Sequence, residues 1–348
     1  MKNNYFLNLS NCLLIAEIGV NHNGDMDLAK EMIVAAKETG ADAVKFQTFK
    51  ADSLVSKGTP KVKYQKCTTS TEESHFEMLK KLELSRDDHF LLKDYCYKNN
   101  IKFLSTPYDV ESARFLDEDL DLEIFKTASA DIIDLPLHEY IAKSGKPSIV
   151  SVGMSSLGEI EENLKIYNTF KNMDVVLLHC VSNYPCAHEN LNLSVLETLK
   201  QAFDLPVGYS DHSLGSEAAI LSVGLGAKVI EKHFTLDKSL AGPDHLASST
   251  PDEFKSLAES VRKAEKILGS SVKICQEEER QMAEVSRKSI FLKNDMQKHD
   301  IIQKDDLITM RPGTGISPLN IKKILGARIN RNLAQGTKLS WSHIEAES

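Results

Sequence analysis

Short apolar segments alternate with amphipathic segments along most of this 348-residue chain, and this alternation restricts the fold more than any other feature. Amphipathic stretches such as DLAKEMIVAAKETG and PDEFKSLAESVRKAEKILG have helical spacing. Parallel strands need crossovers of this kind, so eight strand–helix units predict an α/β fold, a closed (β/α)8 TIM barrel. A doubly wound open sheet is the alternative, but no G-x-G-x-x-G follows the first strand. The apolar segments predict strands at residues 13–20, 43–49, 101–108, 122–129, 148–153, 175–182, 207–212 and 228–235.

The character of the sequence changes near residue 270, which predicts a second domain. We expect the catalytic barrel over residues 1–270, a charged linker over 271–285 and a small C-terminal domain over 286–348. In the small domain, MQKHDIIQKDDL and LAQGTKLSWSHI place apolar residues at matching positions, a weak repeat that indicates pseudo-symmetry. A long segment at residues 50–85 separates the second strand from its helix, and loops of this length are usually functional or disordered.

The charge balance argues against several classes of partner. The 42 Lys and Arg against 50 Asp and Glu give a net charge of −8, so we expect neither nucleic-acid nor membrane-surface binding. No apolar run reaches the about 18 residues that a membrane span requires, and a signal peptide is not expected. The six cysteines form no C-x-x-C pair and are typical of reduced thiols in a cytoplasmic protein.

Every predicted strand carries polar side chains near its C-terminal end, on the face that points into the barrel. In a (β/α)8 barrel the active site lies at this end. The stretch VIEKHFTL shows the pattern, because strand alternation puts Glu231 and His233 on one face and Lys232 on the other. The candidate residues are Glu17, Lys45, Gln47, Thr106, Lys126, Ser129, Ser151, Ser182, Ser210, His212, Glu231 and His233.

Each candidate taken alone also has a structural explanation. A strand lysine such as Lys45 often extends its ammonium group to solvent, and His212 fits a hydrogen-bonded core histidine. The serines at 129, 151 and 210 have the position of helix caps. His179 and Lys232 are expected to face the helices. Convergence of all the other groups at one end of the barrel favours a functional site.

The residue types predict an anion site beside a metal site. Two lysines with hydroxyls at helix N-termini suit a phosphate group. His212 and His233, on adjacent strands, can hold a divalent metal with open positions, where a substrate carbonyl would be polarised. Glu17 and Glu231 would repel each other by about 4 kcal/mol at about 4 Å and an effective dielectric of about 20, so lysines, a metal or a proton must compensate.

The chain resembles the sialic acid synthase family, that is, N-acetylneuraminate synthase and the related legionaminic and pseudaminic acid synthases. The resemblance implies a barrel joined to a C-terminal antifreeze-like (SAF) domain and a domain-swapped homodimer. It also implies condensation of phosphoenolpyruvate with an N-acylated hexosamine, with release of phosphate. The implied cofactor is a divalent metal, most often Mn²⁺, with Mg²⁺ or Co²⁺ as alternatives. The motifs that carry the resemblance are AEIGVNHNGD, AVKFQTFKAD, FLSTPYD, GYSDHS, IEKHFTLD, GPDH and RPGTGISP.

The resemblance also assigns roles to individual residues. It makes His212 and His233 the metal ligands and Glu17, Glu231 and Lys45 the catalytic residues. The implied phosphoenolpyruvate-binding residues are Lys45, Thr106, Lys126, Ser129, Ser151 and Ser210, and the implied sugar-binding residues are Gln47, Ser182, Tyr184, Asp244 and, from the partner's C-terminal domain, Arg311.

The acceptor sugar is the main open question at this stage. We expect N-acetylmannosamine, giving N-acetylneuraminate with C–O bond cleavage. The alternative is a 2,4-diacetamido-2,4,6-trideoxyhexose, because Ala130-Asp131 and Ser182 depart from common family residues where sugar substituents would be read. N-acetylmannosamine 6-phosphate is a further candidate. More distant hypotheses are a Schiff-base aldolase using Lys45 or Lys126, and a non-catalytic carbohydrate-binding protein.

Overall fold

The computed structural model describes residues 4–61 and 73–345. The chain divides into two compact units, Met1–Gly269 and Ser270–Ser348. In the part of the chain that the structure describes, no helix combines the length and apolar character needed to cross a membrane. Each unit has a hydrophobic core of its own.

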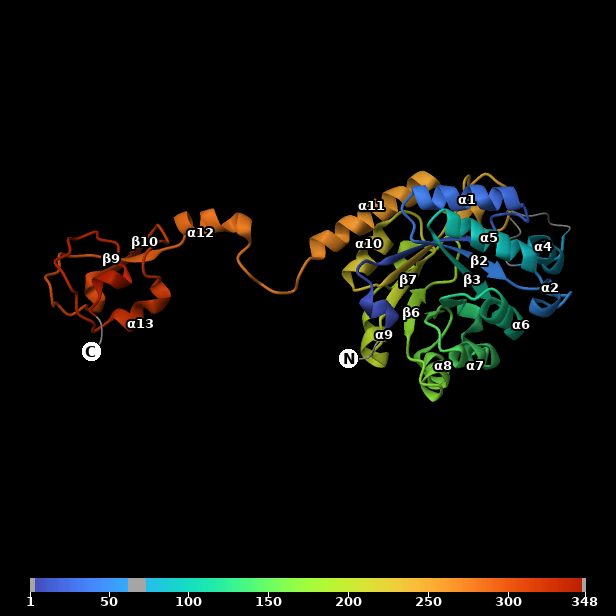
Figure 1. Cartoon of the computed structure of the whole chain (residues 1–348), viewed down its shortest axis with the longest axis horizontal. Coiled ribbons are helices and arrows are strands. Elements are labelled where there is room, and N and C mark those ends of the chain that lie inside the picture. The colour runs from blue at the N-terminus through green and yellow to red at the C-terminus, as the bar shows by residue number, and fades with distance from the viewer. Residues whose placement is uncertain (1–3, 62–72, 346–348) are drawn as a thin grey trace. The chain divides into compact units, whose positions relative to one another are not determined.

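The first unit is a barrel of eight parallel strands surrounded by helices (Figure 1). The hydrogen-bonded order is β3-β2-β1-β8-β7-β6-β5-β4, and β3 and β4 lie side by side at the point of closure. The predicted (β/α)8 fold is therefore confirmed. The strands are β1 (Leu13–Gly19), β2 (Ala43–Thr48), β3 (Lys102–Pro107), β4 (Phe125–Thr127), β5 (Ser148–Ser151), β6 (Val175–Cys180), β7 (Val207–Asp211) and β8 (Val229–His233).

Helices follow each strand, as the alternation of the sequence predicts. Among the helices that the structure describes in the barrel unit, four begin with a capping box. In it, a Ser or Thr side chain and the acid three residues later satisfy each other's free backbone N–H groups. The helices are α1 (Met26–Glu38), α2 (Ala51–Leu54), α4 (His75–Leu82), α5 (Arg86–Lys98), α6 (Val110–Arg114), α7 (Leu135–Ser144), α8 (Leu157–Thr169), α9 (Val195–Phe203), α10 (Glu217–Gly224) and α11 (Pro251–Leu268).

The inner face of the barrel changes character along the strands. Near the N-terminal ends it is apolar, and residues such as Ile15, Ala43, Ile149 and Val229 pack together there with Phe6 of the short N-terminal 3-10 helix. The residues two or more positions further along the same strands are polar. Because side chains alternate between faces, residues two positions apart on a strand point the same way. The strand register therefore positions both the apolar residues inside the barrel and the polar residues at its C-terminal rim.

Lys232 and His179 face away from the barrel interior, as predicted. Lys232 Nζ lies 2.6 Å from Asp211 Oδ2 and donates to the Ser213 carbonyl at 2.7 Å. The Lys232 and Asp211 side chains are only 4% and 0% exposed. His179 Nε2 bonds to the Leu191 carbonyl at 2.7 Å. Lys232 and His179 therefore each have polar partners outside the barrel interior.

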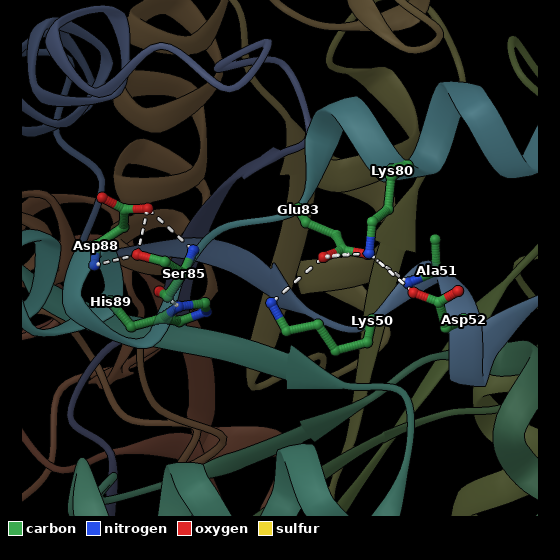
Figure 2. Close-up of polar contacts among 8 residues, drawn as sticks. All are labelled: Lys50, Ala51, Asp52, Lys80, Glu83, Ser85, Asp88 and His89. Carbon is green, nitrogen blue, oxygen red and sulfur yellow. Dashed lines mark hydrogen bonds and ion pairs between the residues drawn. The ribbon is translucent and has the colours of Figure 1, made fainter.

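In its described residues, the long segment between β2 and α5 contributes the helices α2 and α4, which are joined by polar contacts (Figure 2). Glu83 accepts hydrogen bonds from the Ala51 N–H at 2.7 Å, from Lys80 at 3.1 Å and from Lys50 at 3.3 Å. Lys80 also pairs with Asp52 at 2.9 Å. These contacts tie the start of α2 to the end of α4. Residues 62–72 of the predicted 50–85 segment lie outside the described residues.

The second unit contains a short antiparallel pair, β9 (Ser289–Leu292) with β10 (Leu307–Met310), and the helices α12 (Arg280–Ser286) and α13 (Ile321–Ile324). Its internal repeat is visible in the structure. Met296 and Leu333, the first residues of the two copies, form an antiparallel bridge. Ile302 and Leu339, at equivalent positions, are both fully buried in the core of this unit. Equivalent 3-10 helices follow them at Lys304–Asp306 and Trp341–His343.

We predict that Lys232→Met lowers the free energy of unfolding of the protein by about 3–5 kcal/mol, because the buried Asp211 carboxylate would lose its counter-charge. Urea denaturation followed by circular dichroism measures the change. The matched control is Lys98→Met, because Lys98 and Asp94 also lie 2.6 Å apart but are 67% and 57% exposed. Such a surface pair contributes less than about 1 kcal/mol. Equal effects of the two substitutions would contradict the prediction.

Candidate active site

A cavity of about 610 Å³ opens at the C-terminal ends of the barrel strands. All fourteen candidate residues that belong to the barrel line it, so the structure brings them together. Arg311, the remaining candidate, belongs to the second unit. The fourteen are Glu17, Lys45, Gln47, Thr106, Lys126, Ser129, Ser151, Ser182, Tyr184, Ser210, His212, Glu231, His233 and Asp244.

Lys45 of β2 lies at the centre of one polar cluster in this cavity. Its Nζ is 2.7 Å from Glu17 Oε2, 3.9 Å from Glu231 Oε2 and donates to Thr106 Oγ1 at 3.0 Å. Gln47 donates to the other Glu17 oxygen at 3.2 Å. Lys45 is only 3% exposed, so the alternative that it extends into solvent is wrong.

Lys126 of β4 forms the second buried ammonium site. Its Nζ donates to Ser151 Oγ at 2.8 Å and to the Thr127 carbonyl at 3.0 Å, and lies 3.5 Å from Glu231 Oε1. Ser210 donates to the same Glu231 oxygen at 3.2 Å. Glu231 therefore bridges the two lysines. Burial lowers the pKa of Lys126 and Lys45 adds to this shift, while the Glu231 carboxylate opposes it.

The two buried carboxylates differ in their electrostatics. Burial raises the pKa of Glu17, and Glu231 adds to this shift while Lys45 opposes it. Burial also acts to raise the pKa of Glu231, but Lys126 and Lys45 outweigh it and lower that pKa. Glu231 is thus held as a carboxylate, while Glu17 can hold a proton near neutral pH. Two carboxyl groups with pKa values pushed apart are a typical acid and base pair.

The serines at the rim bind neighbouring groups and cap no helix through their side chains. Ser129 Oγ accepts a hydrogen bond from the Gly153 N–H at 3.0 Å and lies 3.0 Å from Cys180 Sγ. A Cβ at Gly153 would lie only 2.8 Å from Ser129 Oγ and 2.6 Å from Cys180 Sγ. The glycine therefore lets three strand ends approach closely, beside the hydroxyls of Ser151 and Ser210. This cluster of donors suits an anionic group.

His212 and His233 lie together beside Tyr184. The two imidazole centroids are 5.6 Å apart, and the Tyr184 ring is 4.1 Å from His212 and 5.5 Å from His233. His212 Nδ1 is 2.8 Å from the Val181 carbonyl, an arrangement that fixes the proton on Nδ1 and leaves Nε2 as a free electron-pair donor. His233 Nδ1 lies 3.8 Å from Asp244 Oδ2 and makes no hydrogen bond with any described residue.

These two imidazoles fit a divalent metal as an open site. Burial lowers the pKa of both His212 and His233, which keeps the rings neutral as metal ligands must be. Among residues 4–61 and 73–345, no three His, Cys, Asp or Glu side chains cluster as a metal-binding group. The protein would therefore supply two ligands, and substrate oxygens and water would complete the coordination.

A β-bulge in β1 shapes the neighbourhood of Glu17. The register of β1 against β2 shifts between Glu17 and Gly19, and Gly19 has a positive φ of 55°. A Cβ at Gly19 would lie 2.9 Å from Glu17 Oε1 and 3.1 Å from Gln47 Nε2. Glycine is therefore required on both conformational and steric grounds.

Several residues that line the cavity are not among those that the sequence predicts. Tyr108 lies two residues beyond Thr106 and directly follows β3, so the alternation of side chains along the strand could have identified it. Met154 has φ of 58° and follows Gly153 directly. Nothing in the sequence pattern identified the apolar residues that the β2–α5 segment contributes. They are Leu54, Val55, Met78, Leu79 and Leu82.

Comparisons with known proteins identify the family of this chain. The NeuB family model matches residues 32–273, and the SAF domain model matches residues 287–345. The chain is 49% identical to the N,N'-diacetyllegionaminic acid synthase of Legionella pneumophila, over 96% of this chain and 95% of the relative. It is 45% identical to the enzyme of the same name from Campylobacter jejuni, over 92% and 96%.

A solved structure shows the same architecture. The N-acetylneuraminic acid synthetase of Leptospira borgpetersenii is 37% identical, with a TM-score of 0.69 over 78% of this chain and 90% of that one. The NeuB match covers most of the barrel and all of the strand ends from β2 onward that form the cavity. The chain thus belongs to the NeuB family, the family of the sialic acid synthases, and carries a C-terminal SAF domain.

Proposed function

We propose that this protein is a condensing enzyme that joins phosphoenolpyruvate to an N-acylated amino sugar in its open-chain aldehyde form. Water is consumed, and a nine-carbon α-keto acid and phosphate are released. The observation that carries the proposal is that two buried lysines and a pair of neighbouring imidazoles line the same cavity. An anion and an electrophilic carbonyl would thus be held together.

The preferred acceptor in this proposal is a 2,4-diacetamido-2,4,6-trideoxyhexose, giving an N,N'-diacetyllegionaminic acid. Identity to the two N,N'-diacetyllegionaminic acid synthases is 49% and 45%, against 37% for the N-acetylneuraminic acid synthetase. This difference supports the acceptor that the sequence analysis gave as the alternative over N-acetylmannosamine.

Phosphoenolpyruvate would lie among the lysines and the rim hydroxyls. Lys45 and Lys126 offset the charges of its carboxylate and phosphate, and Ser129, Ser151 and Ser210 offer hydrogen bonds. Charge increases on the phosphate as it leaves, so fixed ammonium groups in a buried site stabilise the transition state. Each lysine gives up part of its contact with a carboxylate when the anion arrives.

The carboxylates would move the protons of the reaction. Carbon 3 of phosphoenolpyruvate attacks the aldehyde carbon, and Glu17 donates a proton to the aldehyde oxygen, which becomes a hydroxyl. Water adds to carbon 2, and Glu231 accepts one of its protons, so carbon 2 carries a hydroxyl group. The bond between carbon 2 and the bridging oxygen then breaks. The hydroxyl becomes the keto group by giving its proton to Glu17, and Glu231 returns its proton to the departing phosphate. A divalent metal held by His212 and His233, Mn²⁺ in our proposal, supplies polarisation of the aldehyde carbonyl.

The SAF domain would complete the sugar site in a domain-swapped homodimer. Arg311 opens the RPGTGISP motif of the second unit, and its guanidinium group could donate several hydrogen bonds to sugar hydroxyls or acyl oxygens. We propose that it does so in the barrel of the partner subunit. Gln47, Ser182, Tyr184 and Asp244 would contact the sugar from the barrel.

The direct test is release of inorganic phosphate from phosphoenolpyruvate and Mn²⁺ with a panel of acceptors. We expect kcat/KM to be highest with 2,4-diacetamido-2,4,6-trideoxymannose, lower with N-acetylmannosamine, and zero turnover without an acceptor. Loss of turnover in EDTA and recovery on adding Mn²⁺ are also expected. Full turnover in EDTA, together with trapping of pyruvate by borohydride, would instead support the aldolase mechanism.

We predict that His233→Ala leaves the barrel folded but lowers kcat on the order of a thousandfold, because polarisation by a metal contributes several kcal/mol to transition-state stability. Isothermal titration with Mn²⁺ should show weakened binding, and circular dichroism should match the wild type. The control is His188→Ala, which removes an exposed imidazole from the β6–α9 loop. Near-normal turnover and Mn²⁺ binding in His233→Ala would exclude this metal site.

The bond that breaks can be identified with isotopes. If phosphate leaves by C–O cleavage, ¹⁸O placed in the bridging oxygen of phosphoenolpyruvate should appear in the released phosphate. Mass spectrometry of both products measures this distribution. Label retained in the keto acid would mean P–O cleavage and would refute the proposed addition of water to carbon 2.

A further inference from the structure

One side of the cavity is apolar, in contrast to the charged strand ends. It consists of Leu54, Val55, Met78, Leu79 and Leu82, which we call the apolar wall. All five residues come from α2, α4 and the residue that follows α2. The metal ligands and the lysines come from the barrel strands, so the two kinds of lining have separate structural origins.

The apolar wall is firmly packed from behind. Met78 and Leu82 are buried in one cluster with Val20 and Phe49, and Tyr108 packs against this cluster. The Phe49 and Tyr108 rings meet edge to face with centroids 5.9 Å apart. On the outer side, Glu83 and Lys80 fasten α2 to α4 (Figure 2). The wall is therefore a shaped surface of the site.

Polar groups beside the wall are few and uncharged or weakly basic. Ser56, Thr59 and His75 line the cavity on the same segment. Burial lowers the pKa of His75, which favours the neutral ring. Its Nδ1 atom is buried and forms no hydrogen bond within the described part of the chain. An apolar surface next to one unsatisfied imidazole nitrogen matches an acetamido group, which has a methyl at one end and an amide at the other.

The charges on phosphoenolpyruvate make it a poor ligand for this wall. Lys50, just before α2, and Lys80, in the last turn of α4, are engaged by Glu83 and Asp52 and are not among the residues that line the cavity. A fully hydroxylated sugar end is also disfavoured, because each hydroxyl buried against leucine and methionine would lose its hydrogen bonds to water. Methyl-bearing substituents would instead gain free energy by leaving water.

We propose that the apolar wall, with His75, binds the acylamino group of the acceptor that lies farther from the aldehyde, and so determines acceptor specificity. This inference rests on the proposed function, because it places the aldehyde at His212 and His233, at the ends of β7 and β8. The β2–α5 segment would then meet the distant substituents, with the acyl methyl against Leu79 and Val55 and the amide at His75.

The test compares two acceptors that differ by one methyl group. These are 2,4-diacetamido-2,4,6-trideoxymannose and its 4-formamido analogue, with kcat/KM measured by phosphate release. We expect the wild type to prefer the 4-acetamido compound by about tenfold or more, the value of one methyl in an apolar pocket. Leu79→Gln should reduce this preference to about twofold, and Leu79→Met should retain it. Leu91→Gln is the control, because Leu91 is an exposed residue of α5.

Two further measurements keep the outcome decisive. Val55→Thr has nearly the same shape and adds only a hydroxyl, so it should weaken the preference even if Leu79→Gln does not fold. The ratio of kcat/KM between the 2-acetamido compound and its 2-formamido analogue should be the same in the wild type and in Leu79→Gln. No preference in the wild type, or an unchanged preference in both wall variants, would overturn the inference while phosphate release continued. Absence of phosphate release with every acceptor would instead refute the proposed function itself.

Discussion

The arrangement of four charged side chains inside the barrel determines the rest of the site. Lys45 and Lys126 are both almost fully buried, and the carboxylates of Glu17 and Glu231 lie within 4 Å of them. An unpaired ammonium in this position would cost several kcal/mol, so the carboxylates stabilise the charged form of both lysines. The same pairing keeps two cations ready for an anionic substrate. Under the proposed function, the stability of the barrel rim and its affinity for phosphoenolpyruvate would have one electrostatic origin.

The cavity separates two kinds of chemistry on two kinds of structure. The strand ends are rigid and hold the groups whose positions matter for reaction, including the bulged β1 and the glycine contact at Gly153. The β2–α5 segment packs over this rim and contributes mostly apolar side chains. In (β/α)8 enzymes, loops change more easily than strands without loss of the fold. A family with shared chemistry and different acceptor sugars would use such a division.

Strand alternation was enough to identify most of the site. Because successive side chains point to opposite faces, Glu231 and His233 had to face inward once Lys232 faced the helices, and the structure agrees. The same alternation places Tyr108 on the face of Thr106, and Tyr108 lines the cavity. The apolar wall could not be predicted, because Leu54 and Leu79 are ordinary helix residues in sequence. Only the path of the β2–α5 segment brings them to the cavity, and the polar network around Glu83 fixes that path.

The sequence by itself determined the barrel, the face of each strand that points inward and the set of polar residues at the strand ends, because hydrophobic periodicity and strand alternation are local properties. It also determined the repeat of the small domain, in which equivalent apolar residues share one core. The tertiary structure alone decided which charges pair, and therefore which of the two glutamates has a raised pKa and which a lowered one. Those values depend on burial and on distances of a few ångströms between groups far apart in the chain, which no local pattern contains.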